Sequence, residues 1–321
     1  MNLQSIRKIT GGVALLCASF VFASQALAAV PLARVIVAKS GGNYTTITAA
    51  MAAITPTAAA PYVIEVWPGV YTEPGTVNLK SNVHIKGSGR NVTTVKTTIG
   101  TVINGLNVTN VAISGVTVTN SQNGMGVNIR TGSNVTIQDI TVTNTSGGID
   151  VEDVTNAIIT GNRLVGNYYQ GAWIDNISGI ISNNIITGNI GQSSRNSDFG
   201  IILIGTNTAG PRLMVSGNMI SDNSGDGIAL FYDHTNTVIT NNTIVNNALS
   251  GIMHRGISGK FINNVITGNG ATHMDVEAYG SLLGQDGAGA NFVSNVFDDI
   301  TGSPFVGNFN VNSNGDLILV P

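Results

Sequence analysis

The chain has 321 residues, of which 42% are hydrophobic and 10% charged, and its formal net charge is -3. Ordinary soluble domains carry roughly a quarter charged residues, so the polarity here comes from uncharged groups, above all 38 Asn and 40 Gly. Asn, Gly and Thr are poor helix formers, which disfavours a helical bundle. The lack of a basic excess disfavours a nucleic-acid partner. The composition favours a large, regular β protein.

The segment 1–28 has the pattern of a secretory signal peptide. Arg7 and Lys8 precede an apolar run over residues 13–22, and Ala-Leu-Ala at 26–28 forms a small-x-small cleavage motif. The run is shorter than the roughly 20 residues that span a bilayer, and no later run is long enough. We therefore expect no membrane span, with export to the periplasm or the extracellular space. The single cysteine lies in this leader, so the exported chain is expected to have no disulfide.

A short amphipathic helix is predicted at the start of the exported chain. Ile47, Met51 and Ile54 lie on one helical face. Such a helix suits a cap over the open end of a stacked core. Residues 62–66 and 67–71 follow this segment and resemble the entry into the first coil of known parallel β-helix proteins.

An Asn-rich segment recurs through the rest of the chain. Its six clearest copies are residues 138–144, 161–167, 183–189, 217–223, 241–247 and 263–269. The spacing between successive copies is nearly constant, except for one longer step between the third and the fourth. Asn tolerates left-handed backbone geometry at a turn, and its amide can bond to the same amide one coil away. These Asn residues are therefore expected to be structural.

A glycine-led strand repeats in step with the Asn segment. Its copies are residues 126–130, 148–152, 171–175, 200–204, 227–231 and 251–255. Stacked coils of this kind form parallel sheets around one continuous core. The predicted fold is all-β: a single-stranded right-handed parallel β-helix over residues 29–302 with an N-terminal helical cap. Residues 303–321 are expected to form a C-terminal capping tail.

These repeats, together with the predicted cap, resemble the pectin-lyase-like right-handed parallel β-helix superfamily. The resemblance covers most of the exported chain and implies the fold just given. It does not imply one activity, because the superfamily includes lyases, hydrolases, esterases, epimerases and proteins without catalysis.

The outward face of the glycine-led strands is the first candidate for a functional surface. If positions one and three after Gly face the core, positions two and four face outward. Outward Trp173 and Phe231 are candidates for stacking on sugar rings, and Arg130 and Glu277 for polar contacts to substrate. The alternative for the two aromatic residues is packing beneath a loop. Extra residues at 192–198, 206–212 and 278–291 provide such loops, either as walls of a groove or as surface decoration.

Three acidic residues on the same face form a candidate metal site. Asp150, Glu152 and Asp175 fall on adjacent coils, which lie about 4.8 Å apart, so their carboxylates can converge. Oxygen ligands of this kind suit calcium. The alternative is a solvated acidic face.

The candidate catalytic residues are Tyr232, Asp233, His234 and Arg255. Asp233 precedes Arg255 by the length of one repeat, so the two are expected to be neighbours across coils. The arrangement loosely resembles mannuronan C5-epimerases, which carry an Asp-Pro-His signature and an Arg about one coil later; here the Pro is absent. The resemblance implies that Arg255 stabilises developing charge while His234 or Tyr232 exchanges a proton. The alternative is a turn in which Asp233 caps backbone amides.

Two functions remain open from the sequence. The first is an exported protein that acts on an acidic uronate polysaccharide, as a lyase or a C5-epimerase. The second is a non-catalytic surface or matrix protein that binds glycans or serves adhesion. A third reading, an accessory β-helix that handles a metal in the periplasm, has no His or Met cluster to support it. In each case we expect a monomer.

Overall fold

A computed structural model describes residues 32–120, 124–191, 199–205, 212–257, 259–270, 274–276, 291–298, 304–311 and 317–320. The chain divides into two units, Met1–Val30 and Pro31–Pro321. The predicted signal peptide falls in the first unit, which lies outside the described residues. The second unit is almost entirely strand with one short helix. No helix in the described residues is long and apolar enough to cross a membrane.

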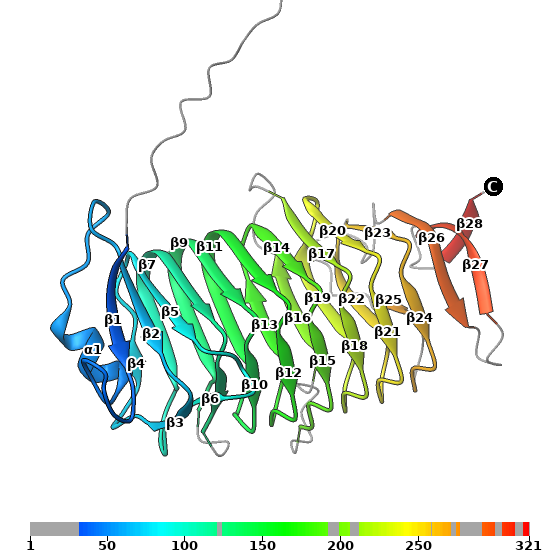
Figure 1. Cartoon of the computed structure of the whole chain (residues 1–321). Coiled ribbons are helices and arrows are strands. Elements are labelled where there is room, and N and C mark those ends of the chain that lie inside the picture. The colour runs from blue at the N-terminus through cyan, green and yellow to red at the C-terminus, as the bar shows by residue number, and fades with distance from the viewer. Residues whose placement is uncertain are drawn as a thin grey trace, which may run out of the picture. The chain divides into compact units, whose positions relative to one another are not determined.

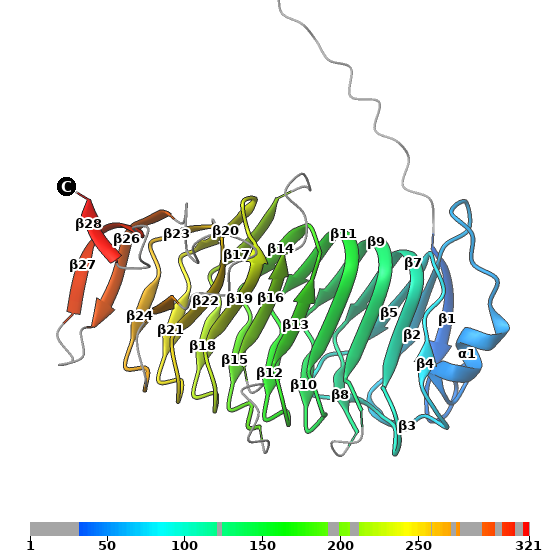
Figure 2. The same ribbon diagram turned by 180° about the vertical axis from the view of Figure 1, so that it is seen from behind.

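The strands form three parallel stacks that run coil upon coil through the second unit (Figure 1 and, from behind, Figure 2). Stack one contains β1 (Ala33–Val37), β2 (Tyr62–Val66), β5 (Val83–Gly87), the second halves of β7 (Ile103–Ser114), β9 (Val127–Gln138) and β11 (Ile149–Thr160), then β14 (Gly179–Ser182), β17 (Leu213–Ser216), β20 (Thr237–Thr240), β23 (Lys260–Ile262) and the start of β26 (Asn291–Asp298). Stack two contains β3 (Gly69–Thr72), β6 (Thr93–Lys96), β8 (Thr117–Thr119), β10 (Thr141–Thr143), β12 (Arg163–Val165), β15 (Ile185–Thr187), β18 (Met219–Ser221), β21 (Thr243–Val245), β24 (Val265–Thr267) and the end of β26.

Stack three is built from the glycine-led strands. It contains β4 (Val77–Asn78), the first halves of β7, β9 and β11, then β13 (Ala172–Asp175), β16 (Ile201–Gly205), β19 (Ile228–Asp233), β22 (Ile252–Ile257) and β25 (Met274–Val276). The predicted all-β parallel β-helix with a helical cap is confirmed. So is its register: Val151 pairs with Ile129 on one side and with Ile174 on the other.

The core follows from the alternation within each strand. Positions one and three after each glycine, such as Ile149 and Val151, are fully buried. The buried side chains at equivalent positions of successive coils pack into one hydrophobic cluster that extends from Val37 to Ile266. Burial of apolar surface contributes roughly 25 cal/mol per Å², so each added coil stabilises its neighbours.

A ladder of buried Asn side chains runs along the turn between stacks one and two. The side-chain amide of each Asn donates to the side-chain oxygen of the Asn one coil later: Asn184 to Asn218 at 2.9 Å, Asn218 to Asn242 at 2.9 Å and Asn242 to Asn264 at 3.0 Å. A second ladder, Asn167, Asn189, Asn223, Asn247 and Asn269, follows the turn after stack two. The predicted amide stacking is confirmed.

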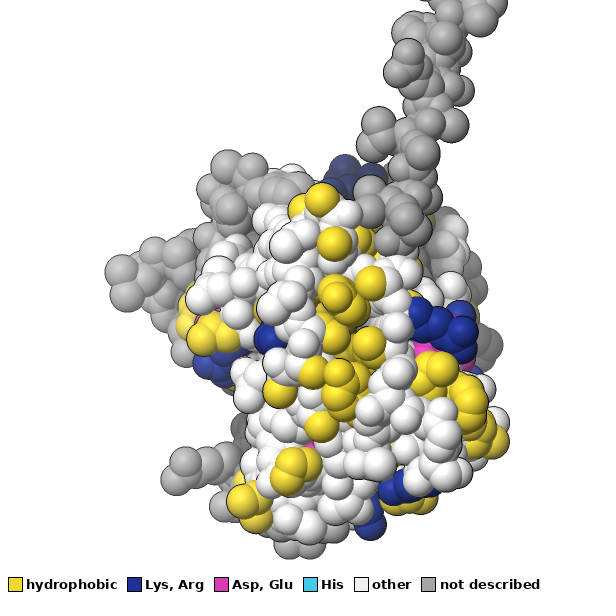
Figure 3. All heavy atoms as spheres, turned by 60° about the vertical axis from the view of Figure 1, so that its left-hand side comes forward, with side chains coloured by type: hydrophobic (Ala, Val, Ile, Leu, Met, Phe, Trp, Pro, Cys, Tyr) yellow, Lys and Arg dark blue, Asp and Glu magenta, His cyan; other side chains and the backbone are white. Residues whose placement is uncertain are grey.

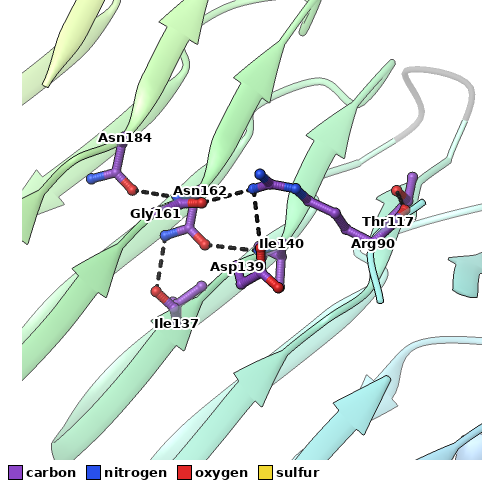
Figure 4. A network of polar contacts seen from close by, with 8 residues as sticks. All are labelled: Arg90, Thr117, Ile137, Asp139, Ile140, Gly161, Asn162 and Asn184. Atoms are coloured by element: carbon purple, nitrogen blue, oxygen red, sulfur yellow. Dashed lines mark hydrogen bonds and ion pairs between the residues drawn. The ribbon is translucent and has the colours of Figure 1, made fainter. Parts of the chain in front are cut away.

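Arg90 fixes the coils where the first ladder begins (Figure 4). Its guanidinium donates to the carbonyl of Gly161 at 2.8 Å and lies 3.3 Å from the carboxylate of Asp139. Thr117 donates to the Arg90 carbonyl at 2.5 Å. The Arg90 side chain thus reaches over several coils at the start of the Asn ladder. The ladder begins at Asn162, because the residue at this position one coil earlier is Ile140, whose backbone N–H donates to Asn162 Oδ1.

The N-terminal end is closed by α1 (Ile47–Ala53), as predicted. Ile47, Met51 and Ile54 are buried against the core. The buried carboxylate of Glu73 accepts bonds from the backbone N–H groups of Ile47 at 2.9 Å and Thr48 at 2.8 Å. It thereby satisfies two of the donors that a helix leaves free in its first turn.

The C-terminal segments pair differently from the coils. β27 (Pro304–Val311) pairs antiparallel with β26, and β28 (Leu317–Val320) pairs antiparallel with β27. The parallel stacking therefore stops at β26, close to the predicted boundary at residue 302. The closing role of the tail stays a prediction.

Figure 3 brings the α1 end of the second unit forward and shows a described surface that is mostly uncharged. Basic and acidic side chains occur there only in small groups. This agrees with the low share of charged residues in the sequence.

Candidate functional site

The outward face of stack three carries two columns of side chains in vertical register. The first column runs through Asn104, Asn128, Asp150, Trp173, Ile202, Ala229 and Met253. The second runs through Leu106, Arg130, Glu152, Asp175, Ile204 and Phe231. Arg255 pairs with Phe231 in the backbone register of the next coil. The face is therefore charged around Arg130, Asp150 and Glu152, and apolar from Ile202 and Ile204 to Phe231.

Arg130 is the centre of the charged part. Its Nε lies 3.2 Å from Glu152 Oε2 and donates to Asn128 Oδ1 at 3.4 Å. Its Nη2 lies 3.6 Å from Asp150 Oδ2. About half of the Arg130 side chain is exposed, so it remains able to meet a ligand. The structure brings together Arg130, Asp150 and Glu152 on adjacent coils, as the register predicted.

Asp150 is the unusual member of this group. It is only 8% exposed, and its Oδ1 is buried without a hydrogen-bond partner among the described residues. Burial raises the pKa of Asp150 to about 6; Arg130 opposes that rise, while Glu152 and Asp175 add to it. A carboxyl group with a pKa of this size exchanges protons readily near neutral pH.

Asp175 completes the acidic group on the next coil. It pairs in register with Glu152, and burial together with the charges of Glu152 and Asp153 raises its pKa. In the part of the chain that the structure describes, no group of three or more His, Cys, Asp or Glu residues is arranged to hold a metal ion. Arg130 already supplies the positive charge between Asp150 and Glu152. Calcium binding by these residues stays a prediction.

The apolar end of the face is a hydrophobic cluster outside the main core. Phe199, Ile202, Ala229 and Met253 are buried in it, and Trp173, Ile204 and Phe231 pack against it. The Phe199 and Phe231 rings meet edge to face with centroids 6.4 Å apart. Phe231 therefore packs against Phe199, a residue that lies outside the strands just before β16. This contact agrees with the alternative of packing beneath a loop. Stacking of Trp173 or Phe231 on sugars stays a prediction, and both side chains are half-buried.

The segment Tyr232-Asp233-His234 lies where β19 ends. Tyr232 is exposed and has a φ of 70°, a left-handed conformation that is uncommon for a bulky residue. Asp233 Oδ1 accepts bonds from the backbone N–H of Thr235 at 2.8 Å and from its hydroxyl at 2.6 Å. Asp233 thus caps a turn, which is the alternative role considered for it.

The expected pairing of Asp233 with Arg255 is wrong. Arg255 pairs in register with Phe231, and Asp233 pairs with Ile257. The coil between Phe231 in β19 and Arg255 in β22 is longer than the shortest coils of the chain. The prediction assumed the length of a short coil, and counting that length back from Arg255 reaches Asp233 instead of Phe231. Glu277, the last predicted substrate contact, lies outside the described residues.

His234 points into the protein rather than toward solvent. It is 2% exposed; its Nε2 lies 2.9 Å from the Phe231 carbonyl oxygen, and its Nδ1 lies 3.3 Å from the Thr237 hydroxyl. Burial, with a smaller effect of His254, lowers the pKa of His234 to about 4. The imidazole is therefore neutral near pH 7, with both ring nitrogens engaged. His254 is fully buried, with its ring centroid 6.3 Å from that of His234, as expected for an inward position.

A pocket that the sequence did not indicate lies at the corner between stack three and stack one. Its volume is about 170 Å³, and its lining includes Asp153, Asn176, Gly205, Asp233 and His234. Asp153 and Asn176 directly follow Glu152 and Asp175, so the pocket adjoins the charged part of the outward face. The residues that follow the second outward column, such as Asp153, Asn176, Gly205 and Tyr232, are of mixed type, so they form no sequence pattern that points to the pocket.

Comparison with known proteins identifies the family of this chain. Residues 81–309 match the family model described as periplasmic copper-binding protein (NosD). The chain belongs to the NosD family. No curated protein sequence matches this NosD-family chain significantly.

Solved structures share the fold with this NosD-family chain. The A-module of mannuronan C-5 epimerase AlgE4 from Azotobacter vinelandii superposes with a TM-score of 0.61 at 18% identity, over 80% of this chain and 78% of that one. An alginate lyase from Paenibacillus sp. str. FPU-7 gives 0.60 at 16%, over 82% and 86%. Pectate lyase Pel9A gives 0.56 at 16%, over 83% and 76%. At these identities the likeness shows the parallel β-helix fold and no particular activity.

Copper, which the family description names, has no suitable set of donors among the described residues. Copper sites use His, Cys and Met side chains. His234 and His254 are adjacent, but both rings are buried and His234 is committed to Phe231 and Thr237. Met253 packs in the outer hydrophobic cluster, on the other side of its strand from His254. The described residues do not fit a copper site.

Proposed function

We propose that this chain is an exported, carbohydrate-active β-helix protein that acts on a uronate polysaccharide by removing the C5 proton, as a lyase or a C5-epimerase. The observation that carries the proposal is Asp150: a nearly buried carboxyl with a pKa of about 6, beside a half-exposed Arg130 on an outward sheet face. The fold shared with uronate-active enzymes supports the same substrate class.

The roles follow from charge and position. Arg130 pairs with the carboxylate of the uronate, and in doing so it moves from Asp150 and Glu152 toward the ligand. Ionised Asp150 then accepts the C5 proton, while Arg130 stabilises the negative charge that develops on the substrate carboxylate. If the bond to O4 breaks, the product is an unsaturated uronate. If a water molecule donates a proton to C5 on the opposite face and Asp150 releases its proton to solvent, the product is the epimer.

In this proposal Asp150 replaces His234 as the group that exchanges the proton. Both His234 ring nitrogens lie close to protein atoms, and its pKa of about 4 leaves it neutral. Asp233 is held by Thr235. Catalytic roles for Tyr232 in proton exchange and for Arg255 in stabilising charge remain predictions.

The test is incubation of the purified exported chain with poly-mannuronate, polygalacturonate and glycosaminoglycan in deuterated water. We expect deuterium at C5 by NMR, with or without the ultraviolet absorbance of an unsaturated uronate. Asp150→Asn should lower the rate by about 100-fold or more, since general base catalysis contributes roughly 10²–10⁴-fold. Asn104→Ala, on the same column but remote from Asp150, is the matched control. Absence of both signals with every polymer contradicts the proposal.

A second candidate is glycan binding without turnover. The observation that favours it is that Arg130 is held by Asp150, Glu152 and Asn128 in a set of contacts that also suits a static binding surface. In that case Arg130→Gln weakens polymer binding, and Asp150→Asn leaves it within about twofold while no C5 exchange occurs. Added calcium and added copper form separate arms, each compared with a chelator, because the calcium prediction and the family description both concern metals.

A further inference from the structure

The corner pocket next to the charged face has the features of a binding site for a small ligand. Its lining includes the polar residues Asp153, Asn176 and Asp233 and the apolar residues Ile177 and Leu213. At about 170 Å³ it is smaller than the roughly 300–1,000 Å³ of pockets for drug-sized ligands. It therefore suits a single small unit rather than a long segment.

Gly205 lines the pocket at a point where the next coil comes very close. Gly205 occupies the place that Asn176 holds one coil earlier and Tyr232 one coil later. A Cβ atom at Gly205 would lie 1.8 Å from the Asp233 carbonyl oxygen, so no other residue fits there. Gly205 therefore lets the Asp233 backbone approach closely, and Asp233 joins Asn176 in the lining of the pocket.

The charges around the pocket select its ligand. No Lys or Arg is present among the described lining residues, and the buried His234 is neutral near pH 7. Asp153 uses Oδ1 to accept from Asn176 at 2.6 Å, and Asp233 uses Oδ1 for Thr235. In the described part of the chain, the Oδ2 atom of each carboxylate has no assigned donor. Two free carboxylate oxygens repel an anion and accept bonds from hydroxyl groups.

We propose that this pocket binds one uncharged sugar residue of the polysaccharide. Sugar hydroxyls donate to Asp153 and Asp233, and the apolar ring face contacts Ile177 and Leu213. The inference takes the class of ligand, a glycan, from the proposed function and rests on it in that respect. It adds that an uncharged sugar lies beside the uronate bound near Arg130. The natural polymer is then a mixed one and not a pure polyuronate.

The test compares two tryptophan variants. Thr155 is exposed and lines the pocket, so Thr155→Trp should block it without disturbing the core. Thr109 precedes Thr155 by two coils in the same column and does not line the pocket, so Thr109→Trp is the matched control. Glucose, mannose and galactose are the neutral probes, glucuronate the anionic probe and glucosamine the cationic one, all measured by saturation-transfer NMR and calorimetry.

We expect at least one neutral sugar to bind the native chain and to lose about tenfold or more in affinity in Thr155→Trp, but not in Thr109→Trp. Asp153→Asn, which keeps the Asn176 contact and tolerates the φ of 52°, should also weaken binding. Binding of glucuronate that Thr155→Trp removes, preference for glucosamine, or no saturable binding of any neutral sugar each overturns the inference. Because C5 exchange on a pure polyuronate is measured separately, failure of the pocket and failure of the proposed function give different results.

Discussion

Two buried titratable residues, Asp150 and His234, respond to acid in opposite directions. Burial disfavours the charged form of each. For Asp150 this raises the pKa to about 6, so the folded chain binds its proton more tightly than the unfolded chain does. For His234 it lowers the pKa to about 4, so the folded chain binds its proton less tightly. Their effects on stability overlap between about pH 4 and 6 and must be separated by substitution.

Asp150→Asn should remove a gain in stability that the native chain shows on acidification. As the pH falls from 7 to 4, the native free energy of unfolding should rise relative to that of the variant, by up to about 3 kcal/mol. Arg130, Glu152 and Asp175 face this group and modulate the size of the effect. Chemical denaturation of both proteins across this range measures it. A difference that does not change with pH would contradict the raised pKa.

His234→Gln should have the reverse effect. The contribution of neutral His234 is fully present above its unfolded pKa of about 6.5 and is lost as the pH falls toward 4. The variant should therefore lose less stability than the native chain over that interval. In the native chain the His234 ring signals should show no titration between about pH 5 and 8 in NMR. A midpoint near 6.5 would show that the ring is open to solvent.

At the scale of the elements, the Asn-rich turns divide two tasks between adjacent residues. The first residue of each pair takes the left-handed conformation, as Asn183 does with φ 54° and Gly217 with φ 64°. The second, Asn184 or Asn218, is buried and forms the ladder. The first position accepts Gly, Asn or Asp because it needs only backbone freedom, whereas the second needs an amide.

Asn218→Ala should destabilise the chain by about 3 kcal/mol or more. The change removes the donor to Ile181 and Asn242 and leaves the amides of Asn184 without their acceptor, and each unsatisfied buried group costs about 1–3 kcal/mol. Asn104→Ala, in the half-buried ladder on the outward face, should cost less than about 1 kcal/mol. Denaturant unfolding of the two variants tests the contrast. Equal decreases in the free energy of unfolding would mean that burial does not determine how much the ladder contributes to stability.

Glu73 links the helical cap to the coils. Its carboxylate accepts from the N–H groups of Ile47 and Thr48 and from the Thr48 hydroxyl at 2.6 Å. Glu73→Ala should cost about 2 kcal/mol or more and increase amide hydrogen exchange in α1 first. Thr46→Ala, which removes only the N-cap bond to Ala49, should cost about 1 kcal/mol. Unchanged exchange in α1 in the Glu73 variant would argue against this role.

At the scale of the whole described unit, the core of each coil packs on the coils next to it, so both ends of the core need a cover. α1 supplies that cover at the first coil, where Ile47 and Met51 are buried on the core. Without it, the apolar end and the open strand edge of β1 would be available to other molecules.

Deletion of residues 32–54, which removes β1 together with α1 and leaves β2 as the uncovered edge, should therefore convert a dispersed protein into aggregates. Light scattering and size-exclusion chromatography at increasing concentration give the measurement. Thr46→Ala serves as the control, because it perturbs the helix without removing it. A deletion variant that stays dispersed and folded would show that the cap is not needed for solubility.

The sequence predicted the fold and the outward columns well because both depend on periodicity. Residues one repeat apart must stack, so the neighbours of Asp150 and the inward position of His254 followed from counting. The pairing of Asp233 with Arg255 failed because the coils differ in length, and the coil before Arg255 is not one of the shortest. The corner pocket was missed because its lining combines residues from several coils, among them Asp153, Asn176 and His234, which no single repeated position brings together.

By itself, the sequence determined a capped stack of coils, since a repeated pattern of apolar and turn residues leaves few other ways to bury the core and satisfy the backbone. Only the tertiary structure decided which polar groups are withdrawn from water. Asp150 and Asp233 are both polar residues on or after glycine-led strands, yet one is buried beside Arg130 and the other caps a turn. Burial depends on what the adjacent coils place around a side chain, and that environment sets the pKa and the chemistry available to it.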